Sequence, residues 1–244
     1  MNESPQIYTE NFRVYQAECD MTEHMLPGTL LRLCQQIATD HCLVHGLDRE
    51  FYQQTHTAFL LAKLTLRWQR TPISGETITL RTRPEKPRRA VYKRVTEVYD
   101  ESGAEIALVD SRWVLVDTET RRILRRPPES HAHFPYAEEV DRELPIEFPR
   151  PEVLEDAGTA KATFTYCDVN GHMNNTHYAD IACDAIPLQE LKEKKIRQMS
   201  INFHSEIPAG ESCRLERGIV EPGVWYVAGM RNDKHCFEAV VTLE

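Results

Sequence analysis

The hydrophobic pattern of this 244-residue chain predicts a long helix followed by several strands. Pro27-Gly28 precedes apolar residues spaced three and four apart, the spacing of a helix with one buried stripe: Leu30, Leu33, Cys34, Ile37, Ala38 and His41. A short first strand is expected at 8–17, before this helix. Alternating runs after the helix predict antiparallel strands near 60–68, 78–80, 91–99 and 107–115, joined by turns such as Ser74-Gly75 and Ser102-Gly103.

The second half repeats this order of elements. A helix is expected from about Asn175 to Ala185, with a charged extension over 188–195. Strands are expected at 199–205, 212–220, 225–230 and 236–243. One helix with several antiparallel strands in each half indicates an α+β fold in which each sheet wraps around its own central helix.

Short segments of the two halves are also alike in sequence. Residues 19–25 (CDMTEHM) and 167–173 (CDVNGHM) share four identical positions, and 68–76 (WQRTPISGE) resembles 203–211 (FHSEIPAGE). A third likeness joins 104–116 to 236–243, so the three occur in the same order and indicate an internal duplication. Six of the 14 prolines fall within one stretch of 25 residues. We therefore expect two domains, 1–126 and 152–244, joined by a proline-rich linker, 127–151.

Composition is that of a soluble globular protein, with 41% hydrophobic and 27% charged residues. No apolar run approaches the roughly 20 residues that span a bilayer, and the first residues, MNESPQ, lack the features of a secretory signal. A cytoplasmic protein without membrane insertion is expected. The seven cysteines include no Cys-x-x-Cys pair, which argues against disulfides and a zinc knuckle. His41 and His45 lack an acidic third ligand in a recognisable motif, so no metal or cofactor is expected.

The net charge of −9 argues against general nucleic-acid binding, but basic residues are concentrated in two places. Segment 81–94 holds seven basic residues and one acidic residue, and segment 121–126 adds four arginines. These segments either attract an acidic partner or are ordinary solvated strand and turn edges.

The candidate chemistry lies in residues 167–178 (CDVNGHMNNTHY). A carboxylate, an amide and an imidazole alternate along what is expected to be an extended segment, so that they would project to one side: Asp168, Asn170 and His172. Gly171 would let the backbone come close to a substrate. Asn174 and Asn175 are good N-cap residues, so the free N–H groups of the following helix would face the same spot. The alternative is a polar turn that only caps a helix.

The run Asp168-x-Asn170-x-His172-x-Asn174-Asn175-x-x-Tyr178 resembles the signature of the acyl-ACP thioesterases, a family of plants and bacteria with two tandem hot-dog domains. The likeness extends from about Tyr8 to Glu244. It implies hydrolysis of fatty acyl-[acyl carrier protein] (acyl-ACP) to free fatty acid. The carrier protein is strongly acidic, so it would suit segments 81–94 and 121–126, with Arg88 and Arg89 among the contacts.

The resemblance also implies the site residues. Asp168, Asn170 and His172 match the family's catalytic positions, and its acidic residue in the strand after the second helix matches Glu206. Plant members have a cysteine after this glutamate where this chain has Ile207, so a cysteine mechanism is not expected. Glu206 or Asp168 would activate water, or Asp168 would attack first and form an anhydride. The first-half copy is expected to be chemically silent, because it keeps Asp20 and His24 but lacks the other site residues.

The first domain is expected to supply an apolar tunnel for the acyl chain. Its candidate lining residues, which otherwise simply fill the core, are Leu30, Leu33, Cys34, Ile37 and Trp68. Two other functions remain open: an acyl-CoA thioesterase, whose relatives carry a related motif, and an acyl-binding hot-dog protein without catalysis. A monomer and a homodimer through exposed sheet edges are both compatible with the sequence.

Overall fold

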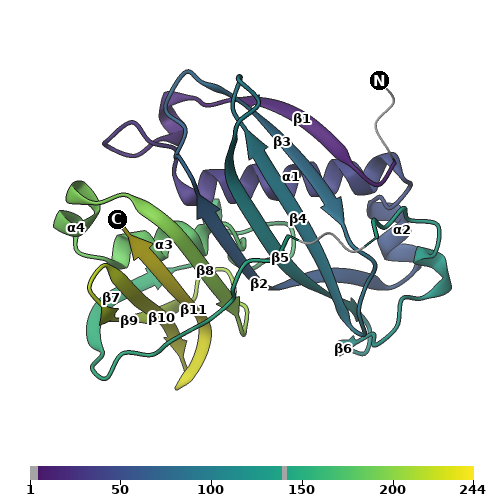
Figure 1. The fold of residues 1–244 in the computed structure, drawn as a ribbon. Coiled ribbons are helices and arrows are strands. Elements are labelled where there is room, and N and C mark those ends of the chain that lie inside the picture. Colours follow the sequence, from purple (N-terminus) through teal and green to yellow (C-terminus); the bar gives the residue numbers. More distant parts are fainter. Residues whose placement is uncertain (1–4, 139–141) are drawn as a thin grey trace.

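The structure is a computed structural model that describes residues 5–138 and 142–244, and it has the two helix-and-sheet units that the pattern predicts (Figure 1). The first half contains helices α1 (Pro27–Val44) and α2 (Arg49–Gln54) and strands β1 (Tyr8–Arg13), β2 (Thr57–Trp68), β3 (Thr77–Pro84), β4 (Val91–Tyr99), β5 (Glu105–Asp117) and β6 (Arg122–Ile123). The second half contains helices α3 (His177–Ala185) and α4 (Leu188–Glu193) and strands β7 (Glu155–Lys161), β8 (Ile196–Phe203), β9 (Ser212–Glu221), β10 (Val224–Arg231) and β11 (Lys234–Leu243).

Local sequence explains where the first helices begin. Pro27 is the first residue of α1, a position where the missing N–H of proline costs no hydrogen bond. The side chain of Asp48 accepts a hydrogen bond from the backbone N–H of Phe51 at 2.8 Å and so caps α2. Helix α2 was not predicted from the sequence, although Asp48 is the N-cap signal that marks its start, and neither were β6 and β7.

The strands of the described residues form one continuous antiparallel sheet. Its order is β1-β3-β4-β5-β2-β8-β11-β10-β9-β7, with β6 paired to β5. The sheets of the two halves join where β2 pairs with β8, from Lys63 opposite Asn202 to Arg67 opposite Gln198. The central helices α1 and α3 contact each other on one side of the sheet. The predicted α+β fold of two tandem hot-dog units is confirmed, and the two units share one sheet.

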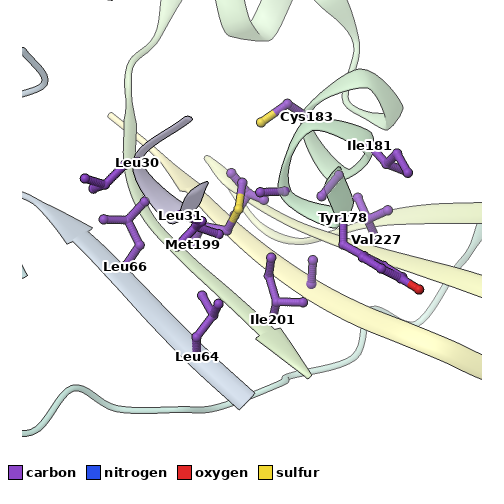
Figure 2. Close-up of a cluster of buried hydrophobic side chains, with 14 of the residues drawn as sticks. Leu30, Leu31, Leu64, Leu66, Tyr178, Ile181, Cys183, Met199, Ile201 and Val227 are labelled. Atoms are coloured by element: carbon purple, nitrogen blue, oxygen red, sulfur yellow. The ribbon is translucent and has the colours of Figure 1, made fainter. Parts of the chain in front are cut away.

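The largest hydrophobic cluster of the described residues extends across the junction of the halves (Figure 2). Leu66 of β2 and Met199 and Ile201 of β8 are each 0% exposed. They face buried residues of both central helices, including Leu30 of α1 and Tyr178 of α3. The core therefore belongs to the pair of units rather than to either one.

Strand β2 departs from simple alternation. The alternating run expected near 60–68 predicts that Leu60, Leu64 and Trp68 share one buried face of the strand. Leu64 and Trp68 are buried, but Leu60 is 41% exposed and Leu61 packs against the core. The pairing of β2 with β5 shifts register between Leu61 and Lys63, and a bulge of this kind moves the preceding residues to the opposite face. The prediction for Leu60 was wrong for this reason.

Residues 142–151 cross the outer face of the shared sheet without forming a helix or strand. The backbone N–H of Leu144 donates to Asp110 Oδ2 at 3.1 Å on β5. The carbonyl of Pro145 accepts from Thr65 Oγ1 at 3.0 Å on β2. Farther on, Arg150 forms an ion pair with Glu238 of β11 at 2.6 Å. This segment therefore binds strands of both halves.

Glu238 is the anchor of that segment in the second half. Its side chain is 5% exposed and accepts hydrogen bonds of 2.6 Å from Tyr226 Oη, His204 Nε2 and Arg150 Nη2. Burial by itself raises the pKa of Glu238, but these donors outweigh it and lower the pKa from 4.5 to about 2.

Glu238→Gln should therefore destabilise the fold in a pH-dependent way. A carboxylate with a lowered pKa contributes its full stability above about pH 4.5 and loses it as the pH falls towards 2. The shift corresponds to about 3 kcal/mol. We expect the free energy of unfolding to drop by that order at pH 7, and the difference from the original protein to shrink below pH 4.5. Denaturant titrations of both proteins at several pH values measure this difference in the free energy of unfolding.

Glu221→Gln, at an exposed position of β9, is the control. A difference that does not change with pH would contradict this role of Glu238.

Candidate active site

A tight turn, rather than the expected extended segment, carries Asp168 and His172. The backbone N–H of Asp168 donates to the carbonyl of His172 at 3.1 Å, and that of Gly171 donates to the carbonyl of Asp168 at 3.0 Å. Gly171 has a φ of 79°, a left-handed conformation that favours glycine. A Cβ on Gly171 would meet no protein atom within 4 Å, so its positive φ, and not crowding by other residues, favours glycine here.

His172 lies between two carboxylates. Its Nε2 is 3.5 Å from Glu206 Oε1, and its Nδ1 is 4.0 Å from Asp168 Oδ1. Nδ1 is also 3.4 Å from the carbonyl of Met173, which can only accept a hydrogen bond. The His172 and Asp168 side chains are 18% and 23% exposed, and that of Glu206 is 60% exposed. The imidazole therefore lies within ion-pair distance of both carboxylates, at a place that water reaches.

Glu206 lies in the loop after β8 and not in the strand, because β8 ends at Phe203. This loop is fixed to the turn: the backbone N–H of Met173 donates to the carbonyl of Ile207 at 2.9 Å, and His172 pairs with Pro208 in an isolated bridge. The Ile207 side chain is 0% exposed, so an apolar core residue stands next to Glu206.

Asn170 is exposed at the tip of the turn. Its backbone N–H donates to Asp168 Oδ1 at 2.9 Å, and its side chain makes no hydrogen bond with any described residue. The structure thus brings together Asp168, His172 and Glu206, and the amide of Asn170 makes no contact with these three side chains that amounts to a hydrogen bond.

The expectation that Asn174 or Asn175 caps the second central helix was wrong. Helix α3 begins at His177, and its N-cap residue is Thr176, which makes no side-chain cap hydrogen bond. Asn174 Oδ1 instead accepts from Thr176 N at 3.0 Å and Thr176 Oγ1 at 2.8 Å, which forms a turn before the helix. No cap side chain therefore occupies the first N–H groups of α3.

The first-half copy repeats the turn at the level of hydrogen bonds. Asp20 N donates to His24 O at 2.8 Å, and Met25 N donates to Pro72 O at 2.9 Å, in parallel with the contacts of Asp168 and Met173. Here Thr22 Oγ1 contacts both Asp20 Oδ1 at 2.7 Å and His24 Nδ1 at 3.0 Å. Thr71 occupies the position of Glu206, so His24 has no counterpart of that second carboxylate.

A cavity of about 30 Å³ lies between α1 and the inner face of the first-half strands. Asn175 and Thr176 line it at the second-half side, and its apolar walls are formed by Leu31, Cys34, Leu61, Leu64, Val109 and Trp113. A space of this size holds about one water, so a longer occupant requires the side chains to move. A larger hollow, about 590 Å³, lies on the opposite face of the sheet beneath residues 143–146.

The predicted tunnel residues occupy different places. Cys34 lines the cavity, whereas Leu30, Ile37 and Trp68 are 0%, 0% and 2% exposed in the core, and Leu33 packs against the core from a half-buried position. Val109, Ser111 and Trp113 also line the cavity, and they are alternate residues of the run near 107–115 that was expected to be a strand. The alternation of this run was therefore the sequence signal that these residues share the face of β5 toward the cavity.

The two basic segments are only partly available to a partner. In segment 81–94, Arg83, Lys86 and Lys93 form ion pairs with Glu97, Glu138 and Glu85, and Arg94 is 9% exposed. Arg88 and Arg89 are exposed at the β3–β4 turn, and Arg121, Arg122, Arg125 and Arg126 are exposed as well. Both groups lie at one end of the sheet, since Val91 pairs with Val114 and Arg122 with Asp117 three residues farther along β5.

Within the described residues, no helix is both long and apolar enough to cross a membrane. In the same part of the chain, no three His, Cys, Asp or Glu side chains gather in a way that could hold a metal ion.

Known proteins resemble this chain in sequence over both halves. A palmitoyl-acyl carrier protein thioesterase of Cuphea hookeriana chloroplasts is 23% identical over 218 residues, which cover 82% of this chain and 52% of the relative. The oleoyl-acyl carrier protein thioesterase 2 of Arabidopsis thaliana chloroplasts is 22% identical over 220 residues, or 82% and 59%. The chain spans about half the length of these curated relatives.

Solved structures share the fold over almost the whole chain. A putative oleoyl thioesterase from Lactobacillus plantarum has a TM-score of 0.86 at 22% identity and covers 98% of this chain and 96% of its own. An acyl-ACP thioesterase from Bacteroides thetaiotaomicron has a TM-score of 0.86 at 21% identity and covers all of both chains. Sequence profiles of the acyl-ACP thioesterase N-terminal and C-terminal domains match residues 5–134 and 157–226. The chain therefore belongs to the acyl-ACP thioesterase family.

Proposed function

We propose that this protein hydrolyses the thioester of fatty acyl-ACP and releases free fatty acid and holo-ACP, with Asp168, Asn170, His172 and Glu206 as its reactive site. The observation that carries the proposal is the position of His172 between Asp168 and Glu206, at 4.0 and 3.5 Å, in a member of this family. The cavity that reaches Asn175 and Thr176 supports it, because an acyl group held there would lie close to this turn.

The chemistry requires an activated water and a stabilised oxyanion. Glu206 is the more exposed carboxylate, so it takes a proton from water, whose oxygen then bonds to the thioester carbon. The N–H groups at the start of α3 hold the negative charge that develops on the carbonyl oxygen. The carbon–sulfur bond breaks, and His172 passes the proton that Glu206 took from water to the leaving thiolate. Asn170 orients the carbonyl once substrate is bound. In the alternative covalent route, Asp168 attacks first and water hydrolyses the resulting anhydride.

The direct test is to incubate the purified protein with acyl-ACPs of increasing chain length and to identify the acids that are released. Release of free fatty acid supports the proposal and gives the chain-length preference. Binding of acyl-ACP without release would instead identify a non-catalytic acyl-binding protein.

Reversing the charge of two exposed arginines tests whether the carrier of the acyl group is ACP or CoA. We expect the double variant Arg88→Glu/Arg89→Glu to lower kcat/KM for acyl-ACP by about tenfold at low salt, because exposed arginines speed the encounter with an acidic partner. The kcat/KM for the same acyl chain on CoA should fall much less. The loss with acyl-ACP should diminish at high salt. Steady-state rates with both substrates measure the difference.

The matched control is Lys192→Glu/Lys195→Glu, which makes the same charge change at exposed positions of the second half. Equal losses with acyl-ACP and acyl-CoA in the arginine variant would favour an acyl-CoA thioesterase.

A further inference from the structure

Arg94 is a buried cation in the wall of the acyl cavity. It lies on β4, is 9% exposed, and lines the cavity together with Thr96 and Ser111. Unlike Arg83 and Lys93 in the same segment, it has no carboxylate within 4.0 Å among residues 5–138 and 142–244. Arg94 belongs to segment 81–94, which was expected either to attract an acidic partner or to be a solvated edge, and its burial excludes both roles for this residue.

The hydrogen-bond partners of Arg94 are neutral. Nη1 lies 3.3 Å from both His41 Nδ1 and Thr82 Oγ1, and Nη2 lies 4.0 Å from Cys42 Sγ. His41 Nε2 is 3.0 Å from the carbonyl of Pro5, so Nε2 carries the hydrogen and Nδ1 accepts from Arg94. Burial lowers the pKa of His41 to about 4, which keeps the imidazole uncharged at neutral pH.

The nearby phenols do not balance the charge either. Burial raises the pKa of Tyr52 and Tyr136 far above 10, so both are neutral. Burial also lowers the pKa of Arg94, but an arginine in a protein stays protonated at neutral pH. A buried charge without a counter-ion is costly unless it finds acceptors. Among the described residues, the donors on Nη2 and Nε find only the sulfur of Cys42, a weak acceptor at 4.0 Å.

We propose that Arg94 binds an oxygen acceptor on the acyl chain itself, so that the preferred substrates are acyl-ACPs whose chain carries a distal carboxylate or hydroxyl. The inference rests on the proposed function and names its substrate class. A carboxylate fits best, because it pairs with a guanidinium through two charge-assisted hydrogen bonds and cancels the buried charge. A plain alkyl chain in the same position would exclude water from Arg94 and offer it no acceptor.

The test compares acyl-ACPs matched in carbon number, with a methyl, a hydroxyl or a carboxylate at the far end, over a ladder of lengths. At the lengths that reach Arg94, the unmodified protein should hydrolyse an oxygenated chain with a kcat/KM roughly 10- to 100-fold above that of the plain chain. The difference between the carboxylate and hydroxyl series identifies which group is used. A preference for the plain chain at every length would overturn the inference.

Two variants separate recognition from folding. Arg94→Met should remove the preference and improve turnover of the plain chain, while Arg94→Lys keeps the charge and should retain part of the preference for the carboxylate. Acetyl-ACP, which has no distal group, is the reference substrate for an intact fold. Hydrolysis of every chain without a preference would overturn the inference alone. Hydrolysis of none would overturn the proposed function and this inference with it.

Discussion

Replacing His172 with alanine should lower kcat/KM for acyl-ACP by roughly 100- to 10,000-fold, the usual contribution of a general acid or base. The imidazole lies 3.5 Å from Glu206 and is the group of the turn that can pass a proton from that carboxyl group to a leaving thiolate. The fold should survive, because the turn is held by backbone hydrogen bonds that alanine retains. Single-turnover rates with a thermal melt of each variant measure both effects.

The duplication supplies a matched control for this experiment. His24 occupies the equivalent place in the first-half turn, with the same backbone contacts but with Thr71 where the second half has Glu206. His24→Ala should change kcat/KM by no more than about twofold, as expected for a substitution outside a site. If His24→Ala were as damaging as His172→Ala, the reactive site would not be confined to the second half.

Asp168→Asn should also lower the rate, by at least about 100-fold. Asparagine keeps the oxygen that accepts from Asn170 N at 2.9 Å, so the turn should form, but the side chain loses its charge and its nucleophilic oxygen. Asp20→Asn in the first half is the control and should have little effect. A fully active Asp168→Asn enzyme would remove Asp168 from the chemistry.

The same residue distinguishes the two chemical routes. Repeated turnover in water enriched in heavy oxygen should leave the peptide that carries Asp168 unlabelled if water attacks the thioester directly. If Asp168 forms an anhydride, water that attacks its carboxyl carbon leaves label in that peptide, which mass spectrometry detects.

The order of elements could be predicted from sequence because helices and strands leave different hydrophobic periods. The limits of β4 matched the prediction at both ends, and the repeated turns were visible as four identities. Spacing alone misjudged the geometry of the site. Asp168 and His172 meet because the chain turns at Gly171 with a positive φ, and not because alternate residues of an extended segment share a side.

Contacts between distant segments were the part that sequence could not supply. Glu206 is 34 positions from His172 and was identified only through the family resemblance. Arg94 belongs to a run of basic residues that is typical of a solvated surface, and only the packing of β4 in the folded protein buries its side chain. The bulge in β2 leaves no mark in the hydrophobic pattern, yet it brings Leu61 into the cavity wall.

The pairing of β2 with β8 also determines what would become of each half on its own. A fragment that ends within residues 127–151 would leave β2 as a free edge, with backbone groups and apolar side chains that β8 had covered. Such an edge tends to pair with another strand, and β2 of a second copy of the same fragment can pair with it in antiparallel orientation. The fused chain thus carries within one polypeptide a contact that a separated half would have to recreate by self-association.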